Sequence, residues 1–146
     1  MLTEAAKRIL VVDDEEFCIS SMKAMLQKAG LDIYHQVDFC INGEEALKLL
    51  IKQYTQGKSY KMIFTDFEMP VMDGIKMTSE IRTFLTHQMD LQRDQQPRIF
   101  GLTGHCTNSF TIKGLQSGMD LVLSKPIYYI KLEKLLYQHK IIAKPK

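Results

Sequence analysis

The sequence predicts an α/β fold in which helices cover a parallel β-sheet. Four short apolar runs alternate with segments of helical periodicity, a pattern typical of strands that are buried on both faces. The runs cover residues 9–12, 62–64, 99–102 and 121–123. The chain has 146 residues, near the usual size of one domain, so we expect a single domain over residues 1–146 with one core.

Apolar residues at helical spacing predict a helix after each strand, and residues typical of helix ends support most of them. The expected helices cover residues 17–29, about 42–54, 75–85, 108–117 and 128–139. Gly30 and Gly118 are typical C-terminal stops, and Asn42 with Glu45 three residues later is a variant of the capping box. Each helix can therefore cover the sheet with one apolar face.

Two segments have weaker patterns. Residues 32–39 carry Ile33 and Val37 at even spacing, which predicts an outer strand of the sheet. Residues 86–97 are polar and rich in glutamine without periodicity, which predicts a longer surface loop.

Charge and cysteine content limit the classes of function. Nineteen basic and seventeen acidic residues give a net charge of +2 without long blocks of one sign, so nothing indicates binding to nucleic acid or to a membrane. The first apolar run is too short for a signal peptide or a membrane span. Three cysteines, Cys18, Cys40 and Cys106, lack metal-site spacing, which favours reduced thiols in a soluble cytoplasmic protein.

Residues suited to phosphate chemistry follow the predicted strands. They are Asp13 and Asp14, then Thr65 and Asp66, then Thr103, and finally Ser124 and Lys125. In open parallel sheets the carboxyl ends of the strands meet at one edge, where ligands bind. Three carboxylates, a hydroxyl and an ammonium would share one crevice there, enough for a divalent cation and a phosphoryl group. Cys106 lies near this crevice, where an inert bystander thiol is the simpler interpretation.

The acidic residues have two interpretations. Asp13 and Asp14 could cap the first helix, whereas Asp66 follows a buried strand with no obvious helix to cap. Two carboxylates about 5 Å apart repel each other by roughly 3 kcal/mol at an effective dielectric constant near 20, so the cluster needs a compensating charge. Mg²⁺ could supply this charge, because it prefers oxygen ligands and keeps waters that a phosphate can displace.

Thr103 and Lys125 also have simpler alternatives. The threonine hydroxyl could bond to its own loop backbone, and the lysine could be a solvated residue before a turn. Their joint position after the last two strands instead favours a hydroxyl and an ammonium that hold two phosphoryl oxygens.

These motifs, in this order and spacing, resemble those of the response-regulator receiver domains of two-component phosphorelays. The resemblance is strongest to the receivers of hybrid histidine kinases. The matching segments are Val-Val-Asp-Asp at 11–14, Asn-Gly-Glu-Glu-Ala-Leu at 42–47, Thr-Asp-Phe-Glu-Met-Pro-Val-Met-Asp-Gly at 65–74, Leu-Thr-Gly at 102–104, Gly-Met-Asp at 118–120 and Leu-Ser-Lys-Pro-Ile at 123–127. The resemblance covers about residues 8–140. It implies a flavodoxin-like, doubly wound, five-stranded parallel sheet of order 2-1-3-4-5 with five surrounding helices.

The resemblance also implies roles for individual residues. Asp66 would be the phosphoacceptor, attacking a phosphohistidine to give aspartyl phosphate, in a signalling domain that is not itself a turnover enzyme. Thr103 and Lys125 would bind phosphoryl oxygens, and the Lys125–Pro126 bond would be cis. The Mg²⁺ ligands would be Asp14, Asp66 and the backbone carbonyl of Glu68, with Asp13 acting mainly through water.

The sequence departs from the receiver pattern at one position. Val122 stands three residues before Lys125, where many receivers carry tyrosine or phenylalanine. The aromatic half of the usual conformational switch is therefore expected to be missing. Gly104 would leave access to the phosphate open. Glu68 and His105 occupy positions that tune phosphoryl hydrolysis in the family, although an exposed loop histidine is the simpler interpretation of His105.

The implied partner is a histidine kinase or a histidine phosphotransfer protein, and no DNA-binding output segment is expected in this chain. Partner contacts are expected at Phe17, Ile19, Ser20, Ser21, Pro126 and Ile127, with core packing as the alternative for Phe17 and Ile19.

Two other functions remain open. One is a docking module that has lost phosphotransfer. The other is an aspartate-nucleophile phosphohydrolase, which would carry a second aspartate where this chain has Glu68.

Overall fold

A five-stranded parallel sheet forms the centre of the protein, which is described here from a computed structural model over residues 8–105 and 107–145. Cys106, the predicted bystander thiol, lies outside the described residues. The strands are β1 (Ile9–Val12), β2 (Val37–Cys40), β3 (Met62–Asp66), β4 (Arg98–Thr103) and β5 (Leu121–Ser124). Their order is β2-β1-β3-β4-β5 with parallel pairing throughout, which confirms the predicted topology.

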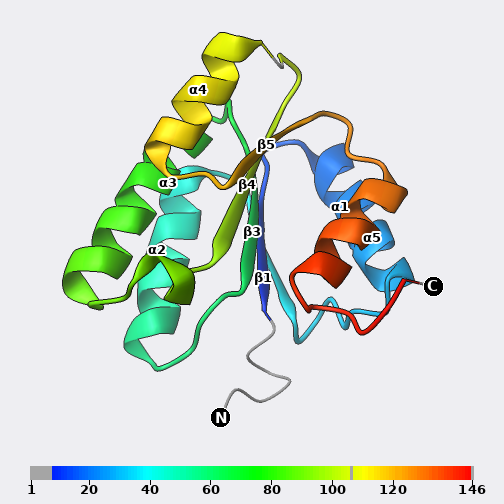
Figure 1. The fold of residues 1–146 in the computed structure, drawn as a ribbon, viewed down its shortest axis with the longest axis horizontal. Helices are drawn as coiled ribbons and strands as arrows, with labels where there is room; N and C mark the ends of the chain where they lie inside the picture. The colour runs from blue at the N-terminus through cyan, green and yellow to red at the C-terminus, as the bar shows by residue number, and fades with distance from the viewer. Residues whose placement is uncertain (1–7, 106, 146) are drawn as a thin grey trace.

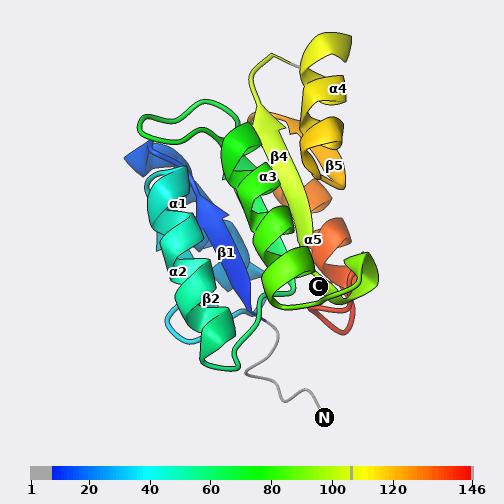
Figure 2. The same cartoon turned by 90° about the vertical axis from the view of Figure 1, so that its left-hand side faces the viewer.

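Helices cover both faces of the sheet in two groups (Figures 1 and 2). They are α1 (Glu16–Lys28), α2 (Gly43–Thr55), α3 (Gly74–Thr83), α4 (Asn108–Ser117) and α5 (Tyr129–Gln138). Helices α1 and α5 lie on one face, and α2, α3 and α4 lie on the other. This arrangement follows from right-handed crossovers between parallel strands.

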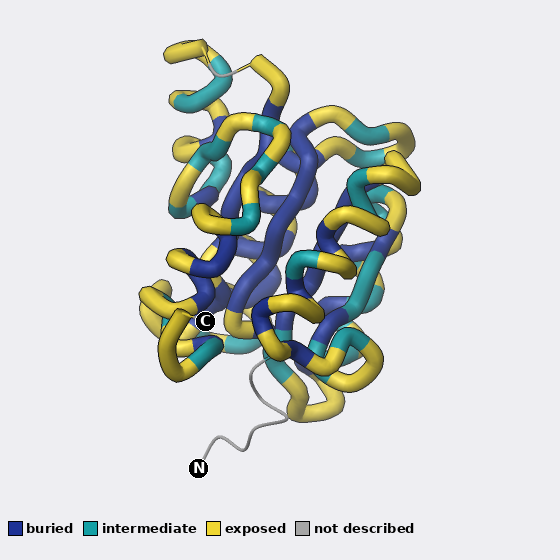
Figure 3. Tube along the Cα trace, turned by 90° about the vertical axis from the view of Figure 1, so that its right-hand side faces the viewer, coloured by how far each residue is buried: buried dark blue, intermediate teal, exposed yellow. Residues whose placement is uncertain are grey.

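Alternate residues of the central strands feed two apolar clusters, one on each face. Val11 and Phe64 pack towards α1 and α5, whereas Leu10 and Ile63 pack towards α2 and α3. All four are buried, and Figure 3 shows the central strands as the continuous buried part of the trace. Burial on both faces explains why these strands read as unbroken apolar runs in the sequence.

The outer strand is shorter than its sequence pattern predicted. Strand β2 begins at Val37, and residues 32–36 form a turn instead. The Asp32 carboxylate accepts hydrogen bonds from the backbone N–H groups of Tyr34 (3.0 Å) and His35 (3.3 Å). A side chain that bonds its own backbone in this way competes with strand pairing, so the strand prediction for 32–36 is wrong.

The segment after α3 contains more regular structure than predicted. The helix continues into a π-helical turn, η2 (Phe84–Gln88), and a short 3₁₀ helix, η3 (Arg93–Gln95), follows. The buried Gln96 side chain donates to Thr86 Oγ1 and to the carbonyl of Leu91, both at 3.0 Å. The prediction of a structureless surface loop over 86–97 is therefore wrong for these turns, because the buried Gln96 side chain bonds back to Thr86 and Leu91 and closes the segment on itself.

The buried Arg82 links residues 96–97 to the turn between α4 and β5 through hydrogen bonds and an ion pair. Arg82 donates to the carbonyls of Gly118 (3.0 Å) and Pro97 (2.9 Å) and to the Gln96 side chain (3.1 Å), and it pairs with Asp120 (3.0 Å). Burial lowers the pKa of Arg82 to about 10, and the charges of Arg93 and Arg98 act in the same direction. The close fit also needs glycine at 118, where φ is 116° and a Cβ would lie 2.7 Å from Arg82 Cγ.

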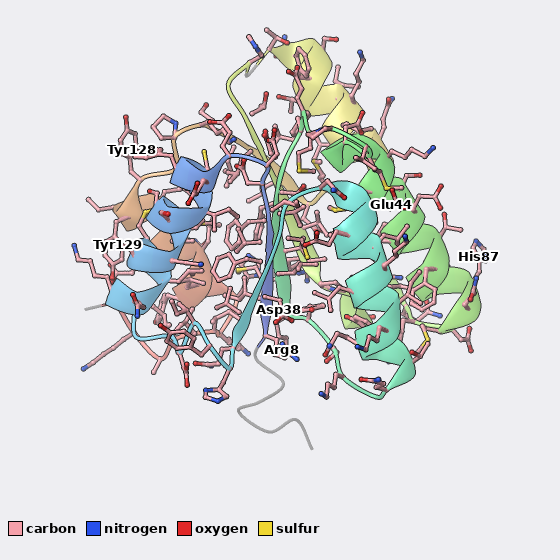
Figure 4. All side chains as sticks on the ribbon, turned by 180° about the vertical axis from the view of Figure 1, so that it is seen from behind. Arg8, Asp38, Glu44, His87, Tyr128 and Tyr129 are labelled. Carbon is pink, nitrogen blue, oxygen red and sulfur yellow. The ribbon has the colours of Figure 1, made fainter. Side chains whose placement is uncertain are left out.

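The amino edge of the sheet, where the strands begin, has its own polar contacts. The Arg8 guanidinium and the Tyr60 hydroxyl both bond to the Asp38 carboxylate, and Arg8 also bonds to the Gln53 side chain. Figure 4 labels Arg8 and Asp38, which lie together where β1 enters the sheet. These contacts hold the first described residues against β2 and α2.

The strand register brings the predicted site residues to the opposite edge. Val12 pairs with Thr65, Thr65 with Gly101, and Gly101 with Val122. The residues that follow each of these positions therefore emerge together at the carboxyl edge of the sheet.

Candidate functional site

A lysine and two aspartates meet at the carboxyl edge of the sheet. Lys125 Nζ lies 2.9 Å from Asp13 Oδ2 and 3.3 Å from Asp66 Oδ2. Asp13 and Asp66 are 4% and 8% exposed, and the Lys125 side chain is 19% exposed. The alternative of a solvated lysine is therefore wrong. The Lys125–Pro126 bond is cis, as the resemblance implied.

Four carboxylates form one cluster in this part of the chain. Asp13, Asp14, Glu15 and Asp66 each offer an oxygen within 4.8 Å of the others. The sequence predicted that the three aspartates lie together but not that Glu15 joins them, since its one signal is its place directly after the aspartate pair. Glu68 is exposed in the loop after β3, two residues beyond Asp66. Hard divalent cations prefer oxygen ligands, so several carboxylates close together suit such an ion.

The electrostatics of the cluster favour a bound cation. Burial raises the pKa of Asp66, and the charge of Asp13 adds to this effect while Lys125 opposes it. Burial alone would lower the pKa of Lys125, but its hydrogen bond to Asp13 and the charges of Asp13 and Asp66 hold this pKa above its ordinary value. One ammonium thus compensates several carboxylates incompletely, which leaves room for further positive charge.

The two aspartates before α1 do not cap the helix. Its N-cap residue is Glu15, and no side chain accepts a capping hydrogen bond there. Asp13 instead accepts a hydrogen bond from the backbone N–H of Glu15 at 2.9 Å, which fixes the loop that carries the acidic cluster. The alternative that Asp13 and Asp14 are helix caps is therefore wrong.

Thr103 ends β4 with its side chain next to the following loop. It is 3% exposed, and its Oγ1 accepts a hydrogen bond from the backbone N–H of His105 at 3.0 Å. The bond to its own loop, which was the simpler alternative, is thus present. Its backbone carbonyl also accepts from the N–H of Lys125 at 2.9 Å, which ties the ends of β4 and β5 together.

The start of α3 is packed tightly against Asp66. A Cβ at Gly74 would lie 2.0 Å from the carbonyl oxygen of Asp66, so only glycine allows this approach. The same carbonyl accepts a hydrogen bond from Thr65 Oγ1 at 2.9 Å. The N-cap residue Asp73 accepts from the N–H of Lys76 at 2.8 Å. These contacts fix the backbone of Asp66 and thereby the direction of its carboxylate.

Known proteins share this fold and sequence pattern. The response regulator receiver domain, as a family, matches residues 9–137 of the chain. The chain belongs to the response regulator receiver domain family. It is therefore a receiver of two-component phosphorelay signalling.

Two relatives illustrate the similarity in sequence. The osmosensing histidine protein kinase SLN1 of Saccharomyces cerevisiae is 32% identical over 133 residues, which cover 91% of this chain and 10% of that protein. The histidine kinase CKI1 of Arabidopsis thaliana is 32% identical over 130 residues, which cover 83% of this chain and 11% of that protein. The chain thus spans about a tenth of the length of these relatives.

Solved structures agree with this assignment. The receiver domain of CKI1 from Arabidopsis thaliana, complexed with Mg²⁺ and BeF₃⁻, matches with a TM-score of 0.74 and 29% identity, covering 92% of this chain and 89% of that one. The receiver domain of Ssk1, in complex with the Saccharomyces cerevisiae phosphotransfer protein Ypd1, matches with a TM-score of 0.74 and 24% identity, covering 90% of this chain and 87% of that one. The latter likeness shows the fold alone.

This receiver carries an aromatic cluster that the sequence did not reveal. The ring of Phe67, which follows Asp66, lies 6.1 Å from that of Phe110, and Phe110 stacks on His105 at 5.8 Å. A Cβ at Gly101 or Gly114 would come within 2.5 Å or 2.8 Å of the Phe67 ring. Phe67 is therefore fitted between β4 and α4, while Val122 on β5 is half-buried beside Gly114.

The thiols of the receiver are free in the residues that the structure describes. Cys18 is half-buried on α1, with its Sγ 3.8 Å from Lys125 Nζ, and its pKa is raised by burial and by the charge of Asp13. Burial raises the pKa of Cys40 to about 12. Neither is a reactive thiolate near neutral pH.

Among the described helices, none is both long and apolar enough to cross a membrane.

Proposed function

We propose that this receiver accepts a phosphoryl group from a phosphohistidine onto Asp66. A carboxylate oxygen of Asp66 attacks phosphorus in line, the bond from phosphorus to the histidine nitrogen breaks, and the imidazole leaves with the electron pair. The observation that carries the proposal is the position of Lys125 Nζ, 3.3 Å from Asp66 and 2.9 Å from Asp13. An ammonium placed there can bind a phosphoryl oxygen as negative charge moves onto the group.

Thr103 would bind a second phosphoryl oxygen. Its hydroxyl now accepts from the N–H of His105, so its own proton is free to be donated to that oxygen. Gly104 leaves open space next to it, because a Cβ at this position would meet no atom within 4 Å. The donor histidine can therefore reach Asp66 past residue 104.

The acidic cluster is suited to hold Mg²⁺ through Asp14, Asp66 and the backbone carbonyl of Glu68, with Asp13 acting mainly through water. Four carboxylates within 4.8 Å of one another and the raised pKa of Asp66 support a cation there. When bound, Mg²⁺ neutralises charge on the transferred phosphoryl group. The solved CKI1 receiver contains Mg²⁺ with BeF₃⁻.

The partner would be a histidine kinase or a histidine phosphotransfer protein, as in the complex of Ssk1 with Ypd1. Phe17 is 82% exposed and Tyr128 is 71% exposed near the site, which suits them to an interface. Figure 4 shows Tyr128 at the outer side of the segment that leads into α5. Ile19 instead packs against the apolar cluster beneath α1, so the core-packing alternative holds for Ile19 and not for Phe17.

Incubation with acetyl phosphate and Mg²⁺, followed by measurement of the intact mass, tests the proposal. We expect a phosphoryl adduct on one carboxylate, with a lifetime long enough to detect. A docking module that has lost phosphotransfer would show no adduct. A phosphohydrolase would consume acetyl phosphate over many turnovers without accumulating an adduct, an outcome that the glutamate at position 68 makes unfavourable.

Millimolar Mg²⁺ should raise the melting temperature, because the ion binds only the folded acidic cluster and relieves its repulsion. At about ten times its Kd the ion should raise Tm by about 4 °C in a domain of this size. Asp14→Asn should reduce this rise to below about 1 °C, as measured by thermal unfolding. Glu16→Gln, an exposed acid outside the cluster, should keep the full rise. Equal rises in wild type and Asp14→Asn would contradict the ligand assignment.

Phosphorylation should move the loop after β4 more than β5 and α5. Val122 has few rotamers to exchange, whereas Thr103 is bonded to His105, and the His105 ring stacks on Phe110. We expect the amide NMR shifts caused by beryllofluoride to concentrate at residues 103–108 and on Phe67 and Phe110. Phe110→Leu should reduce the shifts on α4, while Phe39→Leu should not. Large amide shifts at Val122 and along α5, without shifts at residues 103–108, would argue against transmission through the loop after β4.

A further inference from the structure

An apolar cavity of about 280 Å³ lies between helix α1 and residues 125–127. It lies on the face of the sheet that α1 and α5 cover, as Figure 1 shows for these helices. Its walls include Val11, Phe64 and Leu102 from three neighbouring strands, all at most 6% exposed. Met22 and Met25 of α1 complete the apolar part. The cavity therefore reaches from the surface into the core.

The size of this cavity matches a small organic molecule. Protein interiors are normally packed without hollows larger than a water molecule. An apolar cavity of about 150 Å³ in another protein stays dry and binds benzene or xenon. The larger volume here can accept one substituted aromatic ring or a short alkyl chain. The two methionines can adapt to its shape, because the thioether chain is flexible.

The charged groups of the wall disfavour a charged ligand of either sign. They are Asp13, Glu15 and Lys125. Lys125 is paired with Asp13 and with Asp66, and the second oxygen of Asp13 accepts from the Glu15 N–H. A ligand carboxylate would face this acidic cluster, and a ligand ammonium would have to displace Lys125 or compete with a cation bound there. An uncharged molecule avoids both penalties.

We propose that this cavity is a binding site for a small, uncharged, apolar molecule, of the size of one substituted aromatic ring. Its mouth is formed by Phe17, Pro126 and Ile127, which belong to the expected partner contacts. An occupant therefore competes with a phosphohistidine partner for this surface. This consequence rests on the proposed function, whereas the binding itself does not.

Methyl NMR with toluene as the probe tests the site, in the presence of millimolar Mg²⁺. We expect saturable shifts of the Met22 and Met25 methyl groups, with a Kd of the order of 1 mM. Benzoate and benzylamine, which carry the same ring with opposite charges, should bind at least tenfold more weakly. Failure of toluene to shift these methyl groups saturably, or equally tight binding of either charged probe, would overturn the proposal.

Two matched substitutions on α1 locate the binding. Ser21 borders the cavity and Ser20 does not, and both are exposed. Ser21→Phe should place a ring in the cavity and weaken toluene binding at least tenfold, while Ser20→Phe should leave it unchanged. Ser21→Leu is a smaller filling variant in case Ser21→Phe does not fold. Undiminished binding in the folded Ser21 variants would refute the site. Because no phosphorylation is measured, failure here is distinct from failure of phosphotransfer to Asp66.

Discussion

Asp66→Asn should abolish phosphorylation by acetyl phosphate and leave the fold intact. Asparagine is nearly isosteric with aspartate, but its amide cannot act as the nucleophile. The adduct seen by intact mass should fall by roughly a hundredfold or more relative to wild type. The buried position of Asp66 beside Lys125 also predicts that the variant will be at least as stable as wild type without Mg²⁺, because burial disfavours the charge that it removes.

Asp73→Asn is the matched control for this experiment. Asp73 caps α3 from an exposed position, and asparagine is an equally good cap, so both fold and phosphorylation should be retained. An undiminished adduct on the Asp66→Asn protein would show that another residue accepts the phosphoryl group.

Arg82→Met should lower the free energy of unfolding by about 3 kcal/mol, because it removes a buried charge that is paired with Asp120 and hydrogen-bonded to three further groups. The substitution leaves the carbonyl of Pro97 and the side chain of Gln96 without this donor inside the protein. It also removes the contact with Gly118 at the turn before β5. Urea unfolding followed by circular dichroism measures the loss as a shift of the midpoint.

Arg93→Met is the matched control for Arg82. Arg93 contacts two of the groups that Arg82 also contacts, the Gly118 carbonyl at 2.8 Å and the Asp120 carboxylate at 3.4 Å. The Arg93 side chain, however, is 51% exposed. Its loss should cost less than about 1 kcal/mol, because exposed ion pairs contribute little. Similar losses for the two variants would mean that burial of Arg82 does not determine its contribution.

The parts of the fold predicted correctly from the sequence follow from local periodicity. Strands β1 and β3 read as unbroken apolar runs because both of their faces are buried, and the acids after them mark the edge where ligands bind. Residues 32–39 carry Ile33 and Val37 at even spacing, but the Asp32 side chain bonds its own backbone and turns the chain before Val37. A sequence pattern cannot weigh these two local tendencies against each other.

Other features depend on contacts between distant residues. The turns over 84–95 are held by Gln96, which bonds back to Thr86, and by Arg82, which joins Gln96 to Gly118 and Asp120 at the turn before β5. The Phe67 ring occupies space that exists only because Gly101 and Gly114 lack a Cβ, and these glycines lie on different elements. Glu15 joins the acidic cluster because the loop before α1 folds back on Asp13.

The placement of the amino edge has a consequence for any protein fused to this receiver. Arg8 enters β1 at that edge, and residues 138–140 at the end of α5 border the same hollow as Lys61 and Arg98, which stand at the starts of β3 and β4. Strands of four to six residues span roughly 13–20 Å, so Arg8 and the end of α5 lie about that far from the acidic cluster. A fluorescent protein or surface tether joined before Arg8 or after α5 therefore starts from the edge opposite the acidic cluster. Immobilised receivers should therefore bind soluble partners as well as free ones do.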